Sequence, residues 1–224
     1  MRIAVTGASG KTGWRVVDEA LLRGNQVVPI LRPDSQVPQA LADGKVEIKR
    51  LDLANQAALV AALSGCDALV IATGARPSLD LAGPLKVDAL GIRAQISACK
   101  KAGVERVVLV SSLCSGRFFH PLNLFGLILL WKRLGERWLT ASGLKYTIVR
   151  PGGLKEAEEQ LELQGIRFTD ADQQESSSIP RRLVAKVCLD AIELPAAVGR
   201  ILEITSAEDV VPQALADWLA VNPA

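Results

Sequence analysis

The sequence predicts a single α/β domain, with a doubly wound, mainly parallel sheet of about seven strands and helices on both faces. Short runs rich in β-branched residues alternate with longer helical patterns from the first residue to about Ile204. Several of these runs are apolar at almost every position, as strands are when helices cover both of their faces. Hydrophobic residues make up 49% of the 224-residue chain, which is enough for one large core.

Seven runs are expected to form the strands. Three of them are almost continuously apolar, at Ile3-Ala4-Val5, Leu69-Val70-Ile71 and Val107-Val108-Leu109-Val110. In chain order the predicted strands are Arg2–Thr6, Gln26–Leu31, Val46–Arg50, Ala68–Ala72, Arg106–Ser111, Tyr146–Arg150 and Arg200–Thr205.

Four longer segments between the strands are expected to be helices: Lys11–Arg23, Gln56–Leu63, Pro84–Ala102 and Leu122–Ser142. Two of them end on Gly24 and Gly103, and glycine is the usual C-terminal stop of a helix. Strict alternation ends near Gly152, so residues 152–224 are expected to form a small C-terminal lobe. Within that lobe the polar segment Thr169–Ser178 is predicted to be a surface loop.

Charge and cysteine usage exclude several classes of protein. The 26 basic and 24 acidic residues nearly balance, which gives no reason to expect a nucleic-acid partner. The four cysteines, Cys66, Cys99, Cys114 and Cys188, are too far apart for a zinc site, so no metal is expected and buried free thiols are predicted. Free thiols, together with a strand that begins at Arg2 and leaves no room for a signal peptide, predict a cytoplasmic location.

The apolar stretch from Phe118 to Trp131 is shorter than the roughly 20 residues that a membrane-spanning helix needs. It also contains His120, Pro121 and Asn123. We expect a buried helix or the hydrophobic wall of a pocket here, and contact with a membrane surface is a minor alternative.

A glycine-rich turn follows the first strand directly and opens the first helix: Thr6-Gly7-Ala8-Ser9-Gly10-Lys11-Thr12-Gly13. Gly7 permits a tight turn, Gly10 lets a diphosphate approach the backbone amides, and Gly13 lets the helix pack closely on the sheet. Glycines in this strand–turn–helix context predict a Rossmann-type dinucleotide site that uses Gly7, Ser9, Gly10, Lys11, Thr12 and Gly13. Residues 1–151 would then be the nucleotide-binding core, and residues 152–224 a substrate-side lobe.

The Gly-x-x-Gly-x-x-Gly spacing behind Thr6 resembles the atypical short-chain dehydrogenase/reductase superfamily, over nearly the whole chain. The likeness is strongest to its NmrA-like, Tic62-like and flavin/biliverdin-reductase-like group. The residues that carry it are Pro121-Leu122-Asn123, Trp131-Lys132-Arg133, Tyr146-Thr147-Ile148-Val149-Arg150-Pro151-Gly152-Gly153 and Ile179-Pro180-Arg181-Arg182-Leu183-Val184-Ala185, in which Leu183 replaces the group's acid.

The resemblance implies further cofactor contacts at the carboxyl ends of strands, where open α/β sheets bind ligands. Asp52 and Leu53 would meet the adenine, and Ala72, Thr73 and Gly74 would line the ribose side. The nicotinamide end would be met by Ser111 or Ser112, by Lys132, and by the loop Pro151-Gly152-Gly153.

The choice between NADP and NAD depends on the end of the second strand. An acid there would favour NAD, whereas the sequence reads Ile30-Leu31-Arg32-Pro33-Asp34. Arg32 offers a charged fork that suits a 2′-phosphate, so NADP is favoured and NAD is possible. The alternative is that Arg32 is a solvated loop charge.

The proton donor of the family is missing. Its Tyr-x-x-x-Lys pair would fall on the helix after the fifth strand, where Lys132 matches the lysine but position 128 is isoleucine. The one tyrosine, Tyr146, comes at the start of the next strand, and we expect it to pack there. The usual dehydrogenase mechanism is therefore not expected.

Three side chains are candidates for catalysis: Ser112, Lys132 and His120. His120 is the only histidine, and its titration near neutral pH would suit a proton donor. Each has a simpler interpretation: Ser112 could bond local backbone, Lys132 could pair with Glu136 on the helix surface, and His120 could be an ordinary loop residue.

Two hypotheses of different class remain open. We favour an NADPH-dependent oxidoreductase for a conjugated, flavin- or quinone-like acceptor, because such an acceptor can take its proton from solvent. The alternative is a non-catalytic NADP(H)-binding sensor or assembly protein with a protein partner. A sugar-nucleotide epimerase is disfavoured by the missing phenol, and the chain could be a monomer or a homodimer formed through the Leu122–Ser142 helix.

Overall fold

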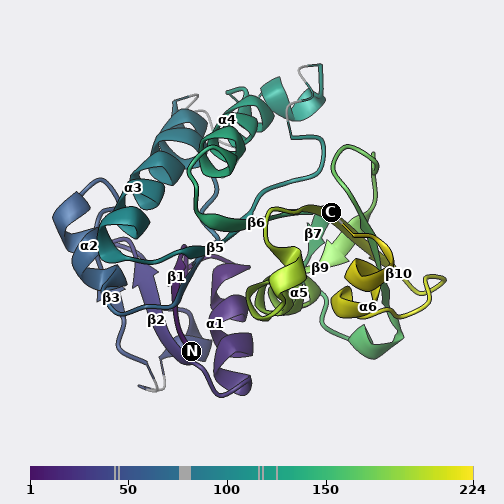
Figure 1. The fold of residues 1–224 in the computed structure, drawn as a ribbon, viewed down its shortest axis with the longest axis horizontal. Coiled ribbons are helices and arrows are strands. Elements are labelled where there is room, and N and C mark those ends of the chain that lie inside the picture. Colours follow the sequence, from purple (N-terminus) through teal and green to yellow (C-terminus); the bar gives the residue numbers. More distant parts are fainter. Residues whose placement is uncertain are drawn as a thin grey trace.

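The computed structural model describes residues 1–42, 44, 46–75, 82–115, 117, 119–124 and 126–223. Its centre is an eight-stranded sheet in the order β3-β2-β1-β4-β5-β6-β10-β8 (Figure 1). All neighbouring strands are parallel except β8, which runs antiparallel to β10. The predicted fold class is confirmed.

The strands of this sheet are β1 (Arg2–Thr6), β2 (Gln26–Leu31), β3 (Lys49–Arg50), β4 (Ala68–Ile71), β5 (Arg106–Val110), β6 (Lys145–Pro151), β8 (Gly165–Thr169) and β10 (Ile201–Ala207). Each of the seven predicted strands is present, although β3 is reduced to its last two residues. β8 was not predicted, and neither was a separate parallel pair, β7 (Gly153–Lys155) with β9 (Ser178–Pro180).

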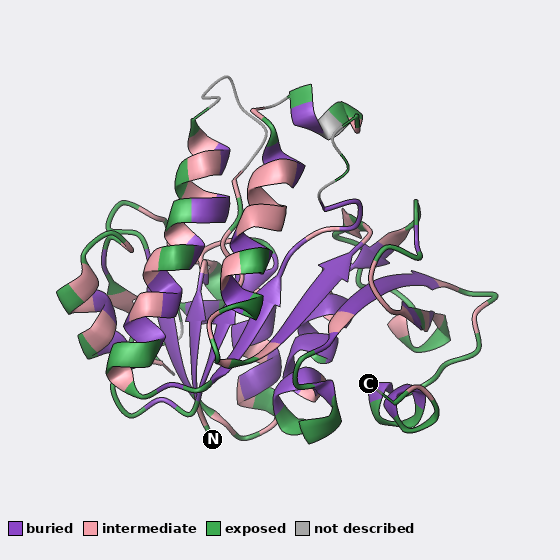
Figure 2. Cartoon of the chain, turned by 45° about the horizontal axis from the view of Figure 1, so that its top comes forward, coloured by how far each residue is buried: buried purple, intermediate pink, exposed green. Residues whose placement is uncertain are grey.

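Helices cover both faces of the sheet, as Figures 1 and 2 show. On one face lie α2 (Gln56–Leu63), α3 (Ile92–Ala102) and α4 (Ile128–Thr140), and a π-helical turn, η2 (Leu85–Gly91), leads into α3. On the other face lie α1 (Gly13–Leu22), α5 (Arg181–Glu193) and α6 (Leu215–Val221). The described part of the chain also contains four short 3₁₀ turns: η1 (Gln39–Leu41), η3 (Pro121–Leu124), η4 (Leu161–Leu163) and η5 (Pro195–Ala197).

Alternate strand residues enter two separate cores. Along β1, Ile3 and Val5 pack under α1 and α5, whereas Ala4 packs under α2 and α3. Successive strand side chains point to opposite faces, so a strand covered on both sides must be apolar at every position. Burial of the central strands is nearly complete (Figure 2).

The predicted helix Leu122–Ser142 is divided in two. Gly126 and Leu127 both have positive φ, at +77° and +57°, and two left-handed residues in succession cannot continue a right-handed helix. The second part begins at Ile128, and the side chain of Asn123 accepts a hydrogen bond of 3.0 Å from the amide of Leu129 in its first turn. In the apolar stretch itself, Phe118 and Phe125 lie outside the described residues.

None of the helices in the described part of the chain is long and apolar enough to cross a membrane. The four cysteines are buried free thiols, as predicted. Burial raises the pKa of Cys188 to about 12, and burial together with Cys66 raises that of Cys99 to about 12.

Candidate functional site

The glycine-rich turn adopts a backbone geometry that requires glycine at two of its positions. Gly7 has a φ of +72°, and a Cβ there would lie 2.6 Å from the carbonyl oxygen of Ala72 at the end of β4. A Cβ on Gly13 would collide with the carbonyl oxygen of Gly7, so only glycine lets α1 start this close to β1. At Gly10 the nearest protein atom to such a Cβ is 3.1 Å away, so contacts within the protein demand glycine less strictly there than at Gly7 and Gly13.

Several polar groups around this turn have no partner within the described part of the chain. The amides of Lys11, Thr12 and Gly13 donate to no described acceptor. Thr73 Oγ1, just after β4, and Arg181 Nε are buried without a hydrogen bond. Buried donors and acceptors are normally satisfied, so their presence here fits a ligand rich in oxygen atoms. A dinucleotide therefore fits the residues present, with its diphosphate at the start of α1.

Paired charges surround the start of α1. Lys11 forms an ion pair with Glu156, and Arg15 forms one with Glu158. Arg182 pairs with both Asp18, at 2.6 Å, and Glu158, at 3.2 Å. The two glutamates follow β7, so the segment after β7 lies against the glycine-rich turn and the start of α1.

Arg32 follows the last residue of β2 and begins a turn in which the amide of Ser35 donates to its carbonyl oxygen at 3.1 Å. Its guanidinium contacts no described hydrogen-bond acceptor or acid. Asp34, at the far side of the turn, is exposed. From β3, Arg50 Nη1 donates to the carbonyl oxygens of Pro33, at 2.7 Å, and Ser35, at 2.9 Å. Sequence reasoning missed Arg50, which holds the turn in place from a strand that lies next to β2.

Lys132 lies on α4 at the inner side of the site. Its Nζ donates to Asp88 Oδ1 at 2.8 Å, and a Cβ on Gly74 would be 3.6 Å from the same Nζ. Asp88 is 1% exposed and also accepts from the amide of Ala75 at 3.0 Å. The alternative interpretation, a surface pair between Lys132 and Glu136, is not what the structure shows, because Lys132 pairs with Asp88. Lys132 instead lies beside the chain segment that leaves β4, where the ribose side of the cofactor was predicted.

Position 128, where the family has its tyrosine, carries an isoleucine that packs among apolar side chains. Ile128 is buried and packs with Leu113, Cys114 and Leu129. Tyr146 is the second residue of β6 and packs against the core under α2 to α4, at the opposite end of the strand from Pro151. Because ligands bind at the carboxyl ends of parallel strands, Tyr146 lies at the opposite end of the sheet from the predicted cofactor site.

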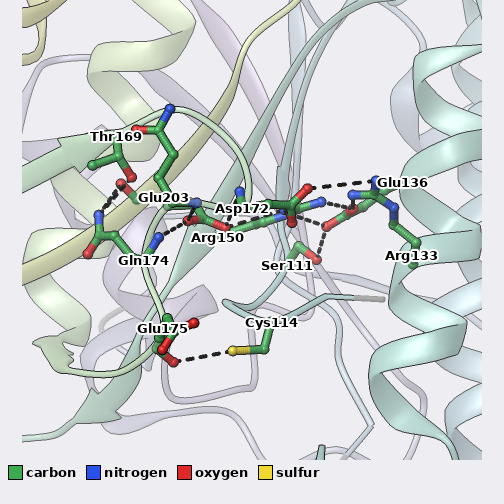
Figure 3. A network of polar contacts seen from close by, with 11 residues as sticks. Ser111, Cys114, Arg133, Glu136, Arg150, Thr169, Asp172, Gln174, Glu175 and Glu203 are labelled. Atoms are coloured by element: carbon green, nitrogen blue, oxygen red, sulfur yellow. Dashed lines mark hydrogen bonds and ion pairs between the residues drawn. The ribbon is translucent and has the colours of Figure 1, made fainter. Parts of the chain in front are cut away.

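A largely buried ionic network joins α4 to β6 and β10, to the residue that follows β5 and to the loop after β8 (Figure 3). Arg150, which is 0% exposed, donates to Glu136 at 2.7 and 3.0 Å, to Asp172 at 2.9 Å and to Glu203 at 3.3 Å. Ser111 Oγ donates to Glu136 at 2.6 Å. Burial alone would lower the pKa of Arg150, but the hydrogen bonds and charges of Glu136 and Asp172 outweigh it and raise the pKa above its usual value.

The same network shapes the predicted loop Thr169–Ser178. Glu203, on β10, accepts hydrogen bonds of 2.7 to 3.0 Å from the amides of Asp172, Gln173 and Gln174. Gln174 is buried and returns a bond to the backbone of Glu203 at 3.0 Å. The segment is a loop, as predicted, but a buried carboxylate holds its inner side.

The remaining predicted residues occupy the same end of the sheet. Ser112 is half-buried and its hydroxyl has no described partner, whereas Ser111 is engaged with Glu136. The loop Pro151-Gly152-Gly153 ends β6, and its glycine amides donate to Ile204 and Ser177. Asp52 Oδ1 accepts from the amide of Ala54, and Leu53 packs on the core. His120 is half-buried in the loop before η3, where its amide donates to the carbonyl oxygen of Arg117 at 3.3 Å.

A cavity of about 590 Å³ lies between α4 and the loops that follow β5 and β8. Its apolar wall is formed by Leu130, Trp131 and Leu134, and Arg117, Arg133 and Arg137 lie around it with Asp172 and Ser115. Ser115 follows the predicted catalytic serine, Ser112, by three residues, and Asp172 contacts Arg150, the residue before Pro151. The cavity therefore borders the loop that follows β5, and its lining residue Asp172 contacts β6, the strand that ends at Pro151.

The sequence matches the family model described as NAD(P)H-binding over residues 7–195. The chain belongs to this NAD(P)H-binding family. The resemblance to atypical short-chain dehydrogenases/reductases is thereby confirmed, and so is the NAD(P)-binding function.

Members of this family and their relatives include reductases. The chain is 29% identical to sanguinarine reductase of Eschscholzia californica, covering 99% of this chain and 94% of that protein. Among solved structures, a Bacillus halodurans protein named as an NAD-dependent epimerase/dehydratase superposes with a TM-score of 0.85 at 27% identity, covering 99% of both chains. The anaerobillin reductase ChuY of Escherichia coli O157:H7 superposes with a TM-score of 0.75 at 25% identity, covering 96% and 100%.

Two plant relatives correct the predicted location. The chain is 34% identical to the chloroplastic protein At2g34460 of Arabidopsis thaliana, covering 98% of this chain and 81% of that protein. It is also 34% identical to the chloroplastic protein TIC 62 of Pisum sativum, with 68% of this chain spanning 33% of that protein. The cytoplasmic prediction is contradicted by these chloroplastic relatives. Unpaired cysteines indicate a reducing environment, and that property does not single out the cytoplasm.

Proposed function

We propose that this protein is an NADPH-dependent oxidoreductase that reduces a planar, conjugated acceptor of the flavin or quinone type. Three observations carry the proposal: the glycine-dependent turn before α1, Lys132 beside the segment that leaves β4, and a buried isoleucine at position 128. The reductases among its relatives support the reaction class, and the buried Ile128 supports an acceptor that needs no tyrosine as proton donor.

Different residues of the chain would bind different parts of the cofactor. The amides of Lys11, Thr12 and Gly13 would hold the diphosphate at the positive end of α1. Lys132, oriented by Asp88, would bind the ribose next to the nicotinamide, and Thr73 Oγ1 would gain the partner that it lacks in the protein alone. NADPH, when bound, supplies the hydride.

Discrimination in favour of NADPH would come from Arg32. Its guanidinium lies at the end of β2, and the two bonds from Arg50 hold the turn that presents it. Asp34 lies two residues further on and at the exposed side of that turn, which removes it from the position that an NAD-specific acid occupies. A second cation, Arg50, behind the same turn adds to the attraction for a 2′-phosphate.

The acceptor would bind in the cavity beside α4. Its volume of about 590 Å³ falls in the range of small-molecule pockets. The apolar wall that includes Trp131 would stack on a flat ring system, and the three arginines around it favour an acceptor with an acidic substituent. The predicted catalytic serine, Ser112, lies three residues before Ser115 of the cavity lining, and the acceptor's proton would come from its hydroxyl or from solvent.

The test is to follow NADPH absorbance with free flavin, quinones and small aldehydes, using Gly10→Asp as the control. We expect turnover with the flat acceptors and none with aldehydes, because an aldehyde needs a proton donor at its oxygen. Gly10→Asp should abolish NADPH binding, since its carboxylate would occupy the diphosphate's approach. Tight NADPH binding without turnover on the whole panel would refute the oxidoreductase and favour the sensor.

A further inference from the structure

Two helices begin next to each other at the glycine-rich turn. Thr12 precedes α1, and Arg181 is the first residue of α5. Arg181 Nη1 donates to Thr12 Oγ1 at 3.1 Å, across 169 residues of sequence. Neither helix has a side-chain cap at its N-terminus or an acid in its first turn. Side-chain caps and first-turn acids usually satisfy the positive N-terminal end of a helix, so both ends remain available to an anion.

Arg181 is a cation that has no counter-ion among the described residues. It forms no ion pair with any described residue, and its Nε is buried without an acceptor. Burial lowers the pKa of Arg181 despite the charge of Glu156, and the nearby Arg15 lowers it further. The next residue, Arg182, is in the opposite situation, because Asp18 and Glu158 outweigh its burial and raise its pKa. A guanidinium with an unsatisfied edge has the geometry for bidentate contact with a phosphate.

From this arrangement we infer that Arg181 is a diphosphate-binding residue of the site, supplied by the C-terminal third of the chain. The inference rests on the proposed cofactor function. It means that the nucleotide is held from two sides, by backbone amides of α1 and by a side chain at the start of α5. The C-terminal residues would thus bind the cofactor itself, in addition to forming the substrate side.

A purely structural role for Arg181 is the competing explanation, since its bond to Thr12 already joins the two parts of the chain. The two roles differ in their dependence on the ligand. Loss of a diphosphate-binding arginine weakens the binding of ligands that carry a diphosphate, whereas loss of a structural arginine weakens the binding of every ligand of the site. Arg182 provides a matched control, because it is adjacent in sequence, equally cationic and already paired with protein carboxylates.

The experiment is calorimetric titration of the wild type, Arg181→Gln and Arg182→Gln with NADPH and with adenosine 2′-phosphate, which lacks a diphosphate. For Arg181→Gln we expect the Kd of NADPH to rise about tenfold or more, the usual effect of losing a charged hydrogen bond to phosphate. The Kd of adenosine 2′-phosphate should stay within about twofold of wild type. Arg182→Gln should leave both values within about threefold, because its charge is already compensated.

Arg181→Lys is the second variant, since it keeps the charge and loses the fork. It should recover part of the lost NADPH affinity, and thermal melting without ligand should confirm that the variants fold. Equal losses for the two ligands, or NADPH affinity unchanged in Arg181→Gln, would overturn the inference while leaving the proposed function intact. Failure of the wild type to bind NADPH at all would overturn the proposed function, and this inference with it.

Discussion

Replacing Arg150 by methionine should destabilise the protein severely. Methionine has a similar length and no charge, so the change leaves Glu136 and Glu203 buried, at 1% and 0% exposure, without their shared cation. Glu203 keeps the three backbone amides that donate to it, whereas Glu136 keeps only Ser111 Oγ and a longer contact of 3.6 Å with Arg133. Most of the cost should therefore arise at Glu136.

The magnitude follows from these contacts. Removing one partner of a buried ion pair costs about 3–5 kcal/mol, because the remaining charge is left in a medium of low polarity. A chain of this size loses roughly 2–4 °C in Tm for each kcal/mol, so we expect Arg150→Met to melt about 6–20 °C below the wild type. Because Glu136 and Lys132 share α4, NADPH affinity should also fall at temperatures where the variant remains folded.

A double-mutant cycle tests the assignment. Thermal and urea unfolding would be measured for the wild type, Arg150→Met, Glu136→Gln and the double variant. If the cost comes from the stranded carboxylate, the double variant should be more stable than Arg150→Met, since its amide no longer needs a counter-ion. A Tm for Arg150→Met within about 2 °C of the wild type, or a double variant less stable than either single one, would refute the reasoning.

Three further predictions concern the turn, the cofactor and the thiols. Gly13→Ala should lose several kcal/mol of stability and all NADPH binding, because the new Cβ would collide with the backbone of Gly7. Circular-dichroism melts would measure the loss of stability and titration the loss of NADPH binding. A variant as stable as the wild type would disprove the prediction. Arg32→Ala should weaken NADPH binding by about 10- to 100-fold and leave NADH within about twofold, and equal losses for both cofactors would contradict its role. Cys188 should resist thiol reagents until the chain unfolds, because its pKa is raised to about 12, and reaction at the rate of an exposed thiol at pH 8 would contradict its burial. Because the pKa of Cys188 is higher in the folded than in the unfolded chain, its neutral thiol contributes to stability. That contribution is fully present below the pKa of the unfolded thiol, which is about 8.5, and is lost as the pH rises toward 12. Melting curves at alkaline pH would record the loss.

Much of the fold could be predicted because its signals are local. Continuous apolar runs such as Val107-Val108-Leu109-Val110 indicate strands covered on both faces, and β5 is fully buried. The helix Gln56–Leu63 agrees with its prediction to the residue. Predictions failed where local pattern and tertiary context disagree. The apolar stretch before Trp131 reads as one helix, but Leu127 is held in a left-handed conformation, and β8 is an edge strand with little hydrophobic signal.

In the candidate site, too, some features follow from the local sequence and others depend on the tertiary structure. By itself, the sequence determined that a strand, three glycines and a helix follow one another, that an arginine replaces an acid after β2, and that position 128 carries no hydroxyl. These are properties of neighbouring residues, and steric demands over a few bonds are enough to fix them. Only the tertiary structure decided which charges are compensated. Arg182 is paired and Arg181 is not, and Arg150 is buried among carboxylates although an arginine in a sequence is normally expected at the surface. Each of these outcomes depends on which elements far apart in the chain pack against each other. The pattern of side chains along one segment carries no information about that packing.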